Sequence, residues 1–490
     1  MSHTTYPTSP QRRQGAQATS RRRLAPALLA CASLLGATPA FAVDWQTPQY
    51  GDDRIDVQNY NLAVEIQPSL TAISGVVTMQ VRSTVATRDF TLDLHALKVS
   101  AVTVGGLKAA YTQTSDKLRI TPVTGLRQNQ VVTVQVTYAG SPSGVIDAAN
   151  TPVWEVNASR RTLHFGTNNS LSPNMFPCNQ VSTDKATYSF AITVPKGLVA
   201  VAPGLPQPAK PAGIGKTTYP FLLAQEIGPQ EVSLTVGPFR VDTATLASGL
   251  RLDLYTMADV TDAPAAMATF RQVMESSERL WGTYRFPSCS AIASAQYADI
   301  YHFAWNMGAN VSWTNIGEEQ GSPFTEWFEY SLSKQFLVSN PARLGEVWFK
   351  DGLDIYARIR LKNQEIQGEV WRWDDYIRDG SPYIPSLLDA DFVTGFKYNG
   401  YNYYYVESAG YTRGTIMMAE LEYRVGRPMV DNILRSWVAL QRTRPVTTTD
   451  FVTNAALVSK DPGVVNLLNS FIYNFPLPTP AFVTGATAGN

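Results

Sequence analysis

The sequence predicts an α+β protein, with an antiparallel β domain first and a mainly helical domain after it. From about Tyr60 to Val241, short segments of alternating apolar and polar residues follow one another, separated by Gly, Pro, Asn or Ser. Farther on, apolar residues recur at helical spacing, and after Ser322 this pattern dominates. Strand after strand without intervening helices favours an antiparallel sheet over βαβ units.

The strand segments of the first domain share a high content of valine and threonine, which favours extended structure. In order they are YNLAVEI, GVVTMQVRST, FTLDLHA, VSAVTVGG, KLRITPV, VVTVQVTYAG, ATYSFAITVP and VSLTVGPFRV. The stretch GLPQPAKPAGIG at 204–215 is rich in Pro and Gly and predicts a loop inside this domain.

The second domain begins where the pattern changes, near residues 242–250. APAAMATFRQVMESSERLWGTY predicts a helix, and FPSCSAIASA predicts one more strand. YTRGTIMMAELEYRVG predicts a helix that ends at Gly426, and TTTDFVTNAALVS a helix capped by Thr or Asp. The tyrosine-rich stretch YNGYNYYYVES is expected to be a loop. The predicted domains are therefore 43–245 and 246–480.

Residues 1–42 predict an export signal. The segment has a basic, polar start, a short apolar run and small residues at an A-x-A site, Ala40 and Ala42. Pro26, Gly36 and Pro39 interrupt the apolar run, so it is too short for a membrane span. A loose twin-arginine pattern and a lipoprotein anchor at Cys31 are alternatives. No other stretch approaches a span, so we expect an exported, periplasmic or extracellular protein that is not integral to the membrane.

The charge balance excludes one class of partner. The 490 residues contain 40 Lys and Arg against 40 Asp and Glu, but five arginines lie in the predicted signal. Their removal leaves 35 basic against 40 acidic residues, so nucleic acid is not an expected partner. Two cysteines remain, Cys178 and Cys289, which are far apart in sequence and are predicted to be buried free thiols.

Several quoted stretches together resemble one family. They are YNLAVEIQPSLTAISGVVTMQVRS, FTLDLHALKVSAVTVGG, FPCNQVSTDKATYSFAITVP, LWGTYRFP, LGEVWFKDGLDIYA, YTRG and TTDFVTNAALVSKDPGVVNLLNSFIYNFPLPTP. In this order and spacing they resemble the gluzincin zinc aminopeptidases, which include membrane alanyl aminopeptidase and leukotriene A hydrolase. The resemblance implies a β-saddle domain followed by a thermolysin-like domain. It stops where the thermolysin-like domain stops, so no C-terminal helical-repeat domain is expected.

The resemblance also locates the family's zinc site, and this sequence departs from it there. The His-Glu-x-x-His window falls on Phe328 to Leu332, so the general base is kept as Glu329 while both histidine positions are apolar. The third ligand position holds Asp351. The four histidines, at 3, 95, 164 and 302, include no pair at i and i+4. We therefore expect no metal ligands and no cofactor, and zinc only if the family's usual chemistry is retained.

The substrate-binding positions implied by the resemblance have changed as well. Trp305 and Asn306 lie in the match to the family's Gly-Ala-Met-Glu-Asn strand, with Asn306 at the position of the amine-binding glutamate. An alternative register through Met307 to Asn310 also lacks an acid. Asn168 lies near the second amine-anchoring position, and amides bind an ammonium group more weakly than carboxylates do. Tyr411 matches the tyrosine that stabilises the oxyanion.

Each candidate also has a structural reading. Glu329 could be a helix-surface or hydrogen-bonded glutamate, Asp351 a polar helix position, and Tyr411 a tyrosine that opens a helix. Trp305 could line an aromatic cleft or pack in the core. Three functional hypotheses follow: a non-catalytic protein that binds a peptide or small molecule, a metal-independent enzyme that uses Glu329 and Tyr411, and, ranked last, an active zinc metallopeptidase.

Overall fold

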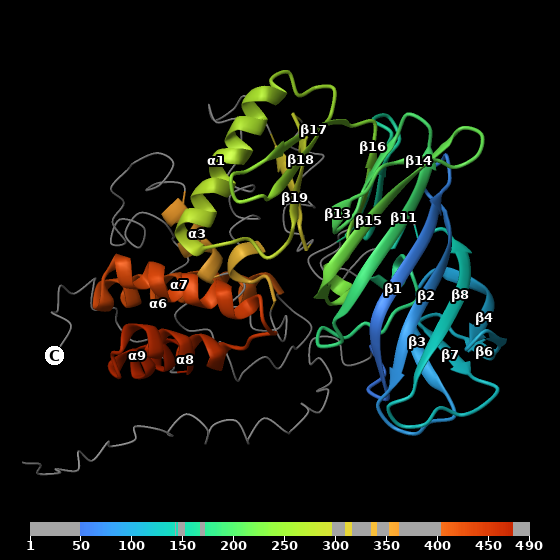
Figure 1. The fold of residues 1–490 in the computed structure, drawn as a ribbon, viewed down its shortest axis with the longest axis horizontal. Helices are drawn as coiled ribbons and strands as arrows, with labels where there is room; N and C mark the ends of the chain where they lie inside the picture. Colours follow the sequence, from blue (N-terminus) through green and yellow to red (C-terminus); the bar gives the residue numbers. More distant parts are fainter. Residues whose placement is uncertain are drawn as a thin grey trace, which may run out of the picture. The chain divides into compact units, whose positions relative to one another are not determined.

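The computed structural model describes residues 50–142, 144–145, 152–166, 172–295, 309–315, 335–340, 352–361 and 403–473. It confirms the α+β class, because strands follow one another up to residue 256 and the last 71 described residues are mainly helical (Figure 1). None of the described helices is long and apolar enough to cross a membrane. The predicted domain limits at residues 42 and 245 remain predictions.

The largest sheet contains most of the predicted strands. Its members are β1 (Ile55–Ile66), β2 (Ile73–Ser83), β4 (Leu97–Val104), β5 (Leu107–Lys108), β8 (Val131–Gly140), β11 (Ala186–Pro195), β13 (Leu205–Pro206), β14 (Lys210–Pro211) and β15 (Lys216–Ile227). They are ordered β13-β15-β11-β1-β2-β8-β4-β5, with β14 also paired to β15. Residues 204–215, predicted as a loop, thus contain two short edge strands, and each includes a proline, as edges tolerate.

One pairing in this sheet differs from the antiparallel prediction. β1 and β11 are parallel, with Tyr60 opposite Tyr188. Parallel neighbours need a long connection, and here more than a hundred residues separate the two strands. The other pairings of the large sheet are antiparallel. Along β2, buried residues alternate with partly exposed ones over the whole strand, so one face of the strand enters the core.

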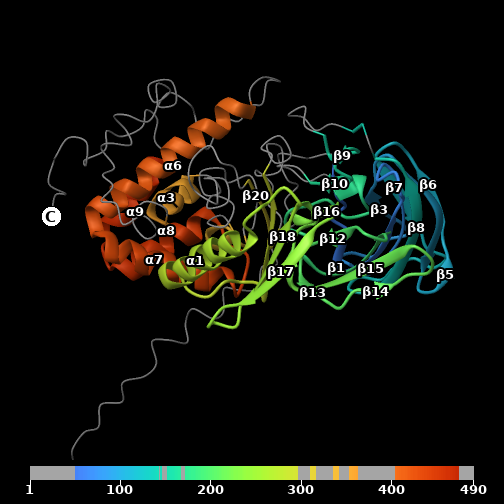
Figure 2. The same cartoon turned by 90° about the horizontal axis from the view of Figure 1, so that it is seen from above.

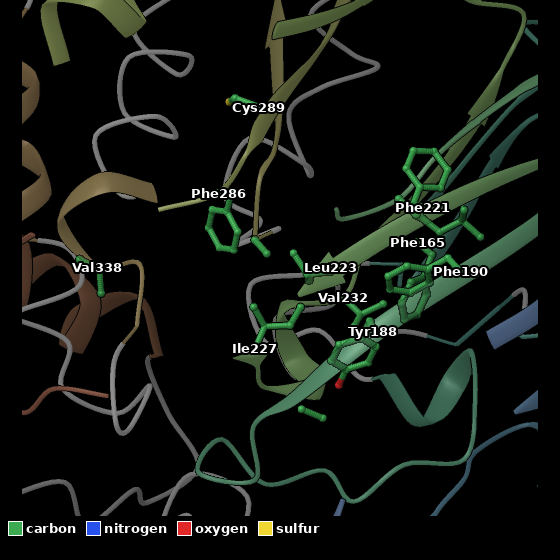
Figure 3. Close-up of a cluster of buried hydrophobic side chains, with 14 of the residues drawn as sticks. Phe165, Tyr188, Phe190, Phe221, Leu223, Ile227, Val232, Phe286, Cys289 and Val338 are labelled. Carbon is green, nitrogen blue, oxygen red and sulfur yellow. The ribbon is translucent and has the colours of Figure 1, made fainter. Parts of the chain in front are cut away.

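Two smaller sheets accompany the large one. One contains β3 (Phe90–Asp93), β7 (Lys117–Thr121) and β6 (Ala110–Gln113), in that order. The other has the order β12 (Val199–Val201), β16 (Leu234–Gly237), β10 (Thr162–Phe165) and β9 (Trp154–Asn157). Short 3-10 turns lie at Ser172–Asn174 and Pro229–Glu231. Aromatic side chains from β10, β11 and β15 gather in the core, and Figure 3 shows Phe165, Tyr188, Phe190 and Phe221 among them.

A fourth sheet combines four strands in the order β17 (Arg240–Thr245), β18 (Arg251–Thr256), β19 (Ser288–Ser294) and β20 (Val311–Asn315). β19 confirms the predicted strand in FPSCSAIASA, and it is parallel to both of its neighbours. All seven of its residues are buried, as expected for a parallel strand covered on both faces. Between β18 and β19 runs α1 (Ala263–Trp281), a predicted helix that Asp262 caps at its start.

The remaining described helices are α3 (Leu353–Ile359), α6 (Tyr403–Val425), α7 (Arg427–Gln441), α8 (Thr448–Ser459) and α9 (Gly463–Tyr473) (Figure 2). The helix end at Gly426 is confirmed, with a left-handed φ of 80°. So is the cap of α8: Thr447 and Asp450 form a capping box. The loop predicted in YNGYNYYYVES was wrong from Tyr403 onward. No Pro or Gly interrupts residues 403–409, and the long apolar pattern that follows extends the helix backward.

Candidate functional site

Most of the predicted site residues lie outside the described residues. These are Asn168, Trp305, Asn306, Glu329 and Asp351, together with the apolar window positions Phe328 and Leu332. Tyr411 lies in helix α6, although its side chain is not among those described. Asn310, in the alternative register, is described. What the structure defines is the framework on either side of these positions.

The first part of this framework is Gln335, which follows the window and is only 7% exposed. Its amide nitrogen donates to the Ser312 hydroxyl at 2.9 Å and to the Val311 carbonyl at 3.2 Å. Its amide oxygen accepts a hydrogen bond of 2.6 Å from the hydroxyl of Tyr284. The segment after the window is therefore bonded both to β20 and to the connection between α1 and β19.

The next residues of this segment are held by α7. The indole nitrogen of Trp437 and the side-chain amide of Gln441 both donate to the carbonyl of Leu337, at 2.8 and 2.9 Å. The Asn340 amide in turn donates to the Gln441 carbonyl at 2.9 Å. Phe336 adds ring contacts, since its centroid lies 4.9 Å from that of Tyr284. These contacts fix the end of the segment without any charged group.

Arg285 links the same segment to the large sheet. Its guanidinium donates to the carbonyl of Ser339 and, at 2.7 Å, to the carbonyl of Glu226 near the end of β15. Burial lowers the pKa of Arg285, while the nearby Glu231 and Glu226 carboxylates act in the opposite direction. Two carbonyls far apart in the sequence are thus joined by one side chain.

The second part of the framework is α3, which begins at Leu353, two residues after Asp351. The hydroxyl of Thr415 on α6 donates to the carbonyl of Gly352 at 3.3 Å. Tyr411 lies four residues before Thr415, which is about one turn of the helix. The structure therefore brings the α6 turn after Tyr411 against the residue that follows Asp351. Asp351 and the side chain of Tyr411 lie outside the described part of the chain, so their roles remain predictions.

Polar pairs tie α3 to α6 and α7 further along. The hydroxyl of Tyr356 donates to the Glu422 carboxylate at 2.6 Å. Burial raises the pKa of Tyr356 well above its usual value, and the Glu422 charge adds to the effect. Arg360 and Asp431 form an ion pair of 3.0 Å, with side chains only 6% and 12% exposed. Tyr356 stays protonated, so it acts here as a hydrogen-bond donor.

The alternative register for the substrate strand ends at Asn310, which the structure describes. Its side chain is fully buried and accepts a hydrogen bond of 2.8 Å from the Gly204 amide. Its nitrogen donates to the carbonyls of Gly204 and Ser288, at 3.2 and 3.0 Å. Asn310 thus joins the β12–β13 connection to the start of β19, which is a structural role.

The chain's donor groups do not fit a zinc ion at the predicted window. Zinc in proteins is held by cysteine, histidine and carboxylate side chains, and Phe328 and Leu332 offer no lone pair. His164 is buried and shares a hydrogen bond of 2.9 Å with Thr235, and burial lowers its pKa to about 3. His95 lies 3.6 Å from Asp116 in the first half of the chain. Among the described residues, no three His, Cys, Asp or Glu side chains gather as a potential metal site.

Sequence reasoning missed Gln335, Arg285 and Thr415. The available signal was weak: Gln335 is a polar residue before the apolar run Phe336-Leu337-Val338, and polar residues are common at helix surfaces. Only the fold reveals that it is buried between β20 and Tyr284. The two cysteines, by contrast, are buried free thiols as predicted.

Comparison with known proteins finds similar folds among solved structures. No family model and no curated protein matches the chain. Among solved structures, a mutant two-domain M1 zinc metallopeptidase bound to L-arginine is similar, with a TM-score of 0.72, 21% identity, and coverage of 88% of this chain and 97% of the other.

The M1 zinc metallopeptidase of Deinococcus radiodurans is similar as well. A mutant bound to a Tyr-Ser-Ala substrate has a TM-score of 0.71 and 21% identity, and it is matched over 98% of its length and 88% of this chain. A further structure of this metallopeptidase has a TM-score of 0.70, also at 21% identity. The chain therefore has the fold of the M1 zinc metallopeptidases, as the resemblance predicted.

Proposed function

We propose that the chain is an exported protein with an aminopeptidase-type fold that binds a peptide or small molecule without hydrolysing it. One observation carries the proposal: the two histidine positions of the zinc window hold Phe328 and Leu332, and no other histidine pair at i and i+4 exists in the sequence. Hydrolysis by this fold needs a metal-bound water, and two carboxylates alone do not supply a tetrahedral zinc site.

The proposal also covers the domains, the export, the cofactor and the ligand contacts of the protein. In this proposal the chain combines a β-saddle domain with a thermolysin-like domain, and the match to 97% of a two-domain metallopeptidase supports this combination. The export signal places the protein in the periplasm or outside the cell. No cofactor is required. The ligand contacts are assigned to Asn168, Trp305, Asn306 and Asp351.

A peptide is the favoured ligand because a structural neighbour is described as bound to Tyr-Ser-Ala. In this chain Asn306 matches the position of the family's amine-binding glutamate, and Asn168 lies near the second amine-anchoring position, which is Glu or Gln in the family. Amides contact an ammonium group without charge pairing, so the affinity for a free amino end is expected to be modest. A ligand that offers neutral hydrogen-bonding groups suits these residues at least as well.

A metal-independent enzyme is the second candidate, and one observation favours it. The Thr415 hydroxyl donates to the carbonyl of Gly352, so the turn of α6 that follows Tyr411 contacts the residue after Asp351. In this candidate Glu329 acts as the base, with Tyr411 or Asp351 as its partner. An active zinc metallopeptidase is the third candidate, and it requires ligands that the sequence does not provide.

The three candidates predict different results for metal content, peptide binding and turnover of the purified full chain. Elemental analysis should find no stoichiometric zinc, and Tyr-Ser-Ala should be bound in calorimetry without release of tyrosine. Glu329→Gln should leave the binding nearly unchanged. Loss of a metal-free turnover in this variant would establish the second candidate instead, whereas tightly bound zinc with tripeptide hydrolysis would establish the third. Absence of binding to any di- or tripeptide would remove the peptide from the proposal.

A further inference from the structure

An ion pair joins two segments that are distant in the sequence. Arg160 lies in the turn between β9 and β10, and Asp259 lies between β18 and α1. The Arg160 guanidinium donates to the Asp259 carboxylate at 2.7 Å and to the hydroxyl of Ser294, the last residue of β19, at 3.2 Å. The amide of Ala295 donates to the other oxygen of Asp259 at 3.4 Å. Three segments thus meet at this carboxylate.

The burial of this pair is intermediate. The side chains of Arg160 and Asp259 are 16% and 26% exposed, so they are partly removed from water yet reached by it. A pair of this kind is stronger than a fully exposed one, but dissolved salt still screens it. In the described part of the chain, strand β9 is the edge of its sheet, and the strand neighbour of the β9–β10 hairpin, β16, lies on the β10 side. The buried side chains of Trp154, Leu163 and Phe165 anchor the strands of the hairpin, and the ion pair contacts its turn.

The other contacts between these regions differ in kind. A small apolar cluster contains Val201, Phe239, Tyr255, Met257, Ile292 and Val311, which come from both the β12–β16 sheet and the β17–β20 sheet. Beside it lies the fully buried Asn310 with its bonds to Gly204 and Ser288. These contacts are apolar or uncharged and closed to water, so salt should weaken them little.

We infer that the Arg160–Asp259 pair is a salt-sensitive latch that holds the β9–β10 hairpin on the end of β19. The apolar cluster and Asn310 hold the β12–β16 and β17–β20 sheets together. The latch determines how often the hairpin separates from the loop that contains Asp259. This inference goes beyond the proposed function and does not depend on it.

Hydrogen exchange of the full-length protein tests the latch. In Arg160→Gln, amides of residues 153–166 and 257–260 should exchange about tenfold faster, while amides of β1 and β2 stay within about twofold of the wild type. The wild type should show the same local change when the salt concentration is raised to about 1 M, and the variant should not respond. The matched control is Arg240→Gln, which removes an exposed pair with Asp242 on β17 and should leave the hairpin unchanged.

Three further variants distinguish a local effect from a folding defect. Asp259→Asn removes the pair from the other side and should reproduce the local effect, and combining it with Arg160→Gln should add little. The exchanged pair, Arg160→Asp with Asp259→Arg, should restore part of the protection. Unchanged exchange in both single variants would overturn the inference. So would an equal rise in exchange throughout the chain, because that result would indicate a general loss of stability instead of a latch.

Discussion

Gln335 offers the sharpest test of how the predicted site is held in place. Replacement by methionine keeps the length and most of the volume of the side chain but removes its hydrogen bonds with Tyr284, Ser312 and Val311. A typical intramolecular hydrogen bond contributes about 1 kcal/mol, so three of them correspond to about 3 kcal/mol. The Tyr284 hydroxyl and the Val311 carbonyl would also be left buried without this partner. We therefore expect the free energy of unfolding to fall by about 2–4 kcal/mol.

Urea unfolding followed by fluorescence and circular dichroism measures this loss as a change in the free energy of unfolding. The slope with urea should stay constant, because the surface exposed on unfolding does not change. The exposed Gln58 on β1 provides the matched control, and Gln58→Met should change stability by less than about 0.5 kcal/mol. If Gln335→Met were as stable as the control, the bonds around Gln335 would not hold the segment, and the reasoning would be wrong.

Three further predictions concern other parts of the chain. Asp431→Ala should cost about 3–5 kcal/mol in urea unfolding because it leaves the Arg360 guanidinium buried without this carboxylate, whereas replacing both residues by apolar ones should cost less. Burial, and then the charge of Asp56, raises the pKa of Asp184. The folded state thus keeps a proton that the unfolded state loses near pH 4, and stability should fall above that pH by up to about 1.4 kcal/mol per unit, until the raised pKa is reached. Asp184→Asn should remove this slope in thermal melts recorded across pH; an unaltered slope would assign it to other groups. Thr447→Ala should cost about 1 kcal/mol through the lost cap of α8, and a neutral result in the same melts would contradict the capping role.

Local patterns predicted many elements of the fold, since alternation and helical spacing are local properties. The helix α1, the cap at Thr447 and eight strands were found where the sequence indicated them, namely β1, β2, β3, β4, β7, β8, β11 and β16. The other strands up to β16 were not predicted, and β13 and β14 lie in a segment predicted as a loop. Strand partners are a different matter, because a strand's own pattern does not encode its neighbour. The parallel pairing of β1 with β11 and the parallel strands around β19 could not be read from the chain.

The candidate site depended on the resemblance more than on any local pattern. The zinc window, Asn306 and Tyr411 were located by matching motifs, and the fold comparison supports the scaffold on which those matches rest. Gln335 could not be found in this way, because its importance arises from three contacts with β20 and the α1–β19 connection. Such contacts form between segments distant in sequence, so they become visible only once the chain is folded.

These contacts also lead to a prediction about metal removal. The segment after the window is hydrogen-bonded to β20 and α7, and the segment after Asp351 is hydrogen-bonded to α6. A bound ion would add to stability in proportion to the logarithm of its concentration over its dissociation constant, about 4 kcal/mol at a thousandfold excess. Because the window provides no histidine ligands, incubation with a chelator should leave the melting temperature within about 1 °C of its starting value. A fall of several degrees that zinc reverses, while the same treatment of a Glu329→Gln, Asp351→Asn double variant has no effect, would show that the chain holds an ion at this place after all.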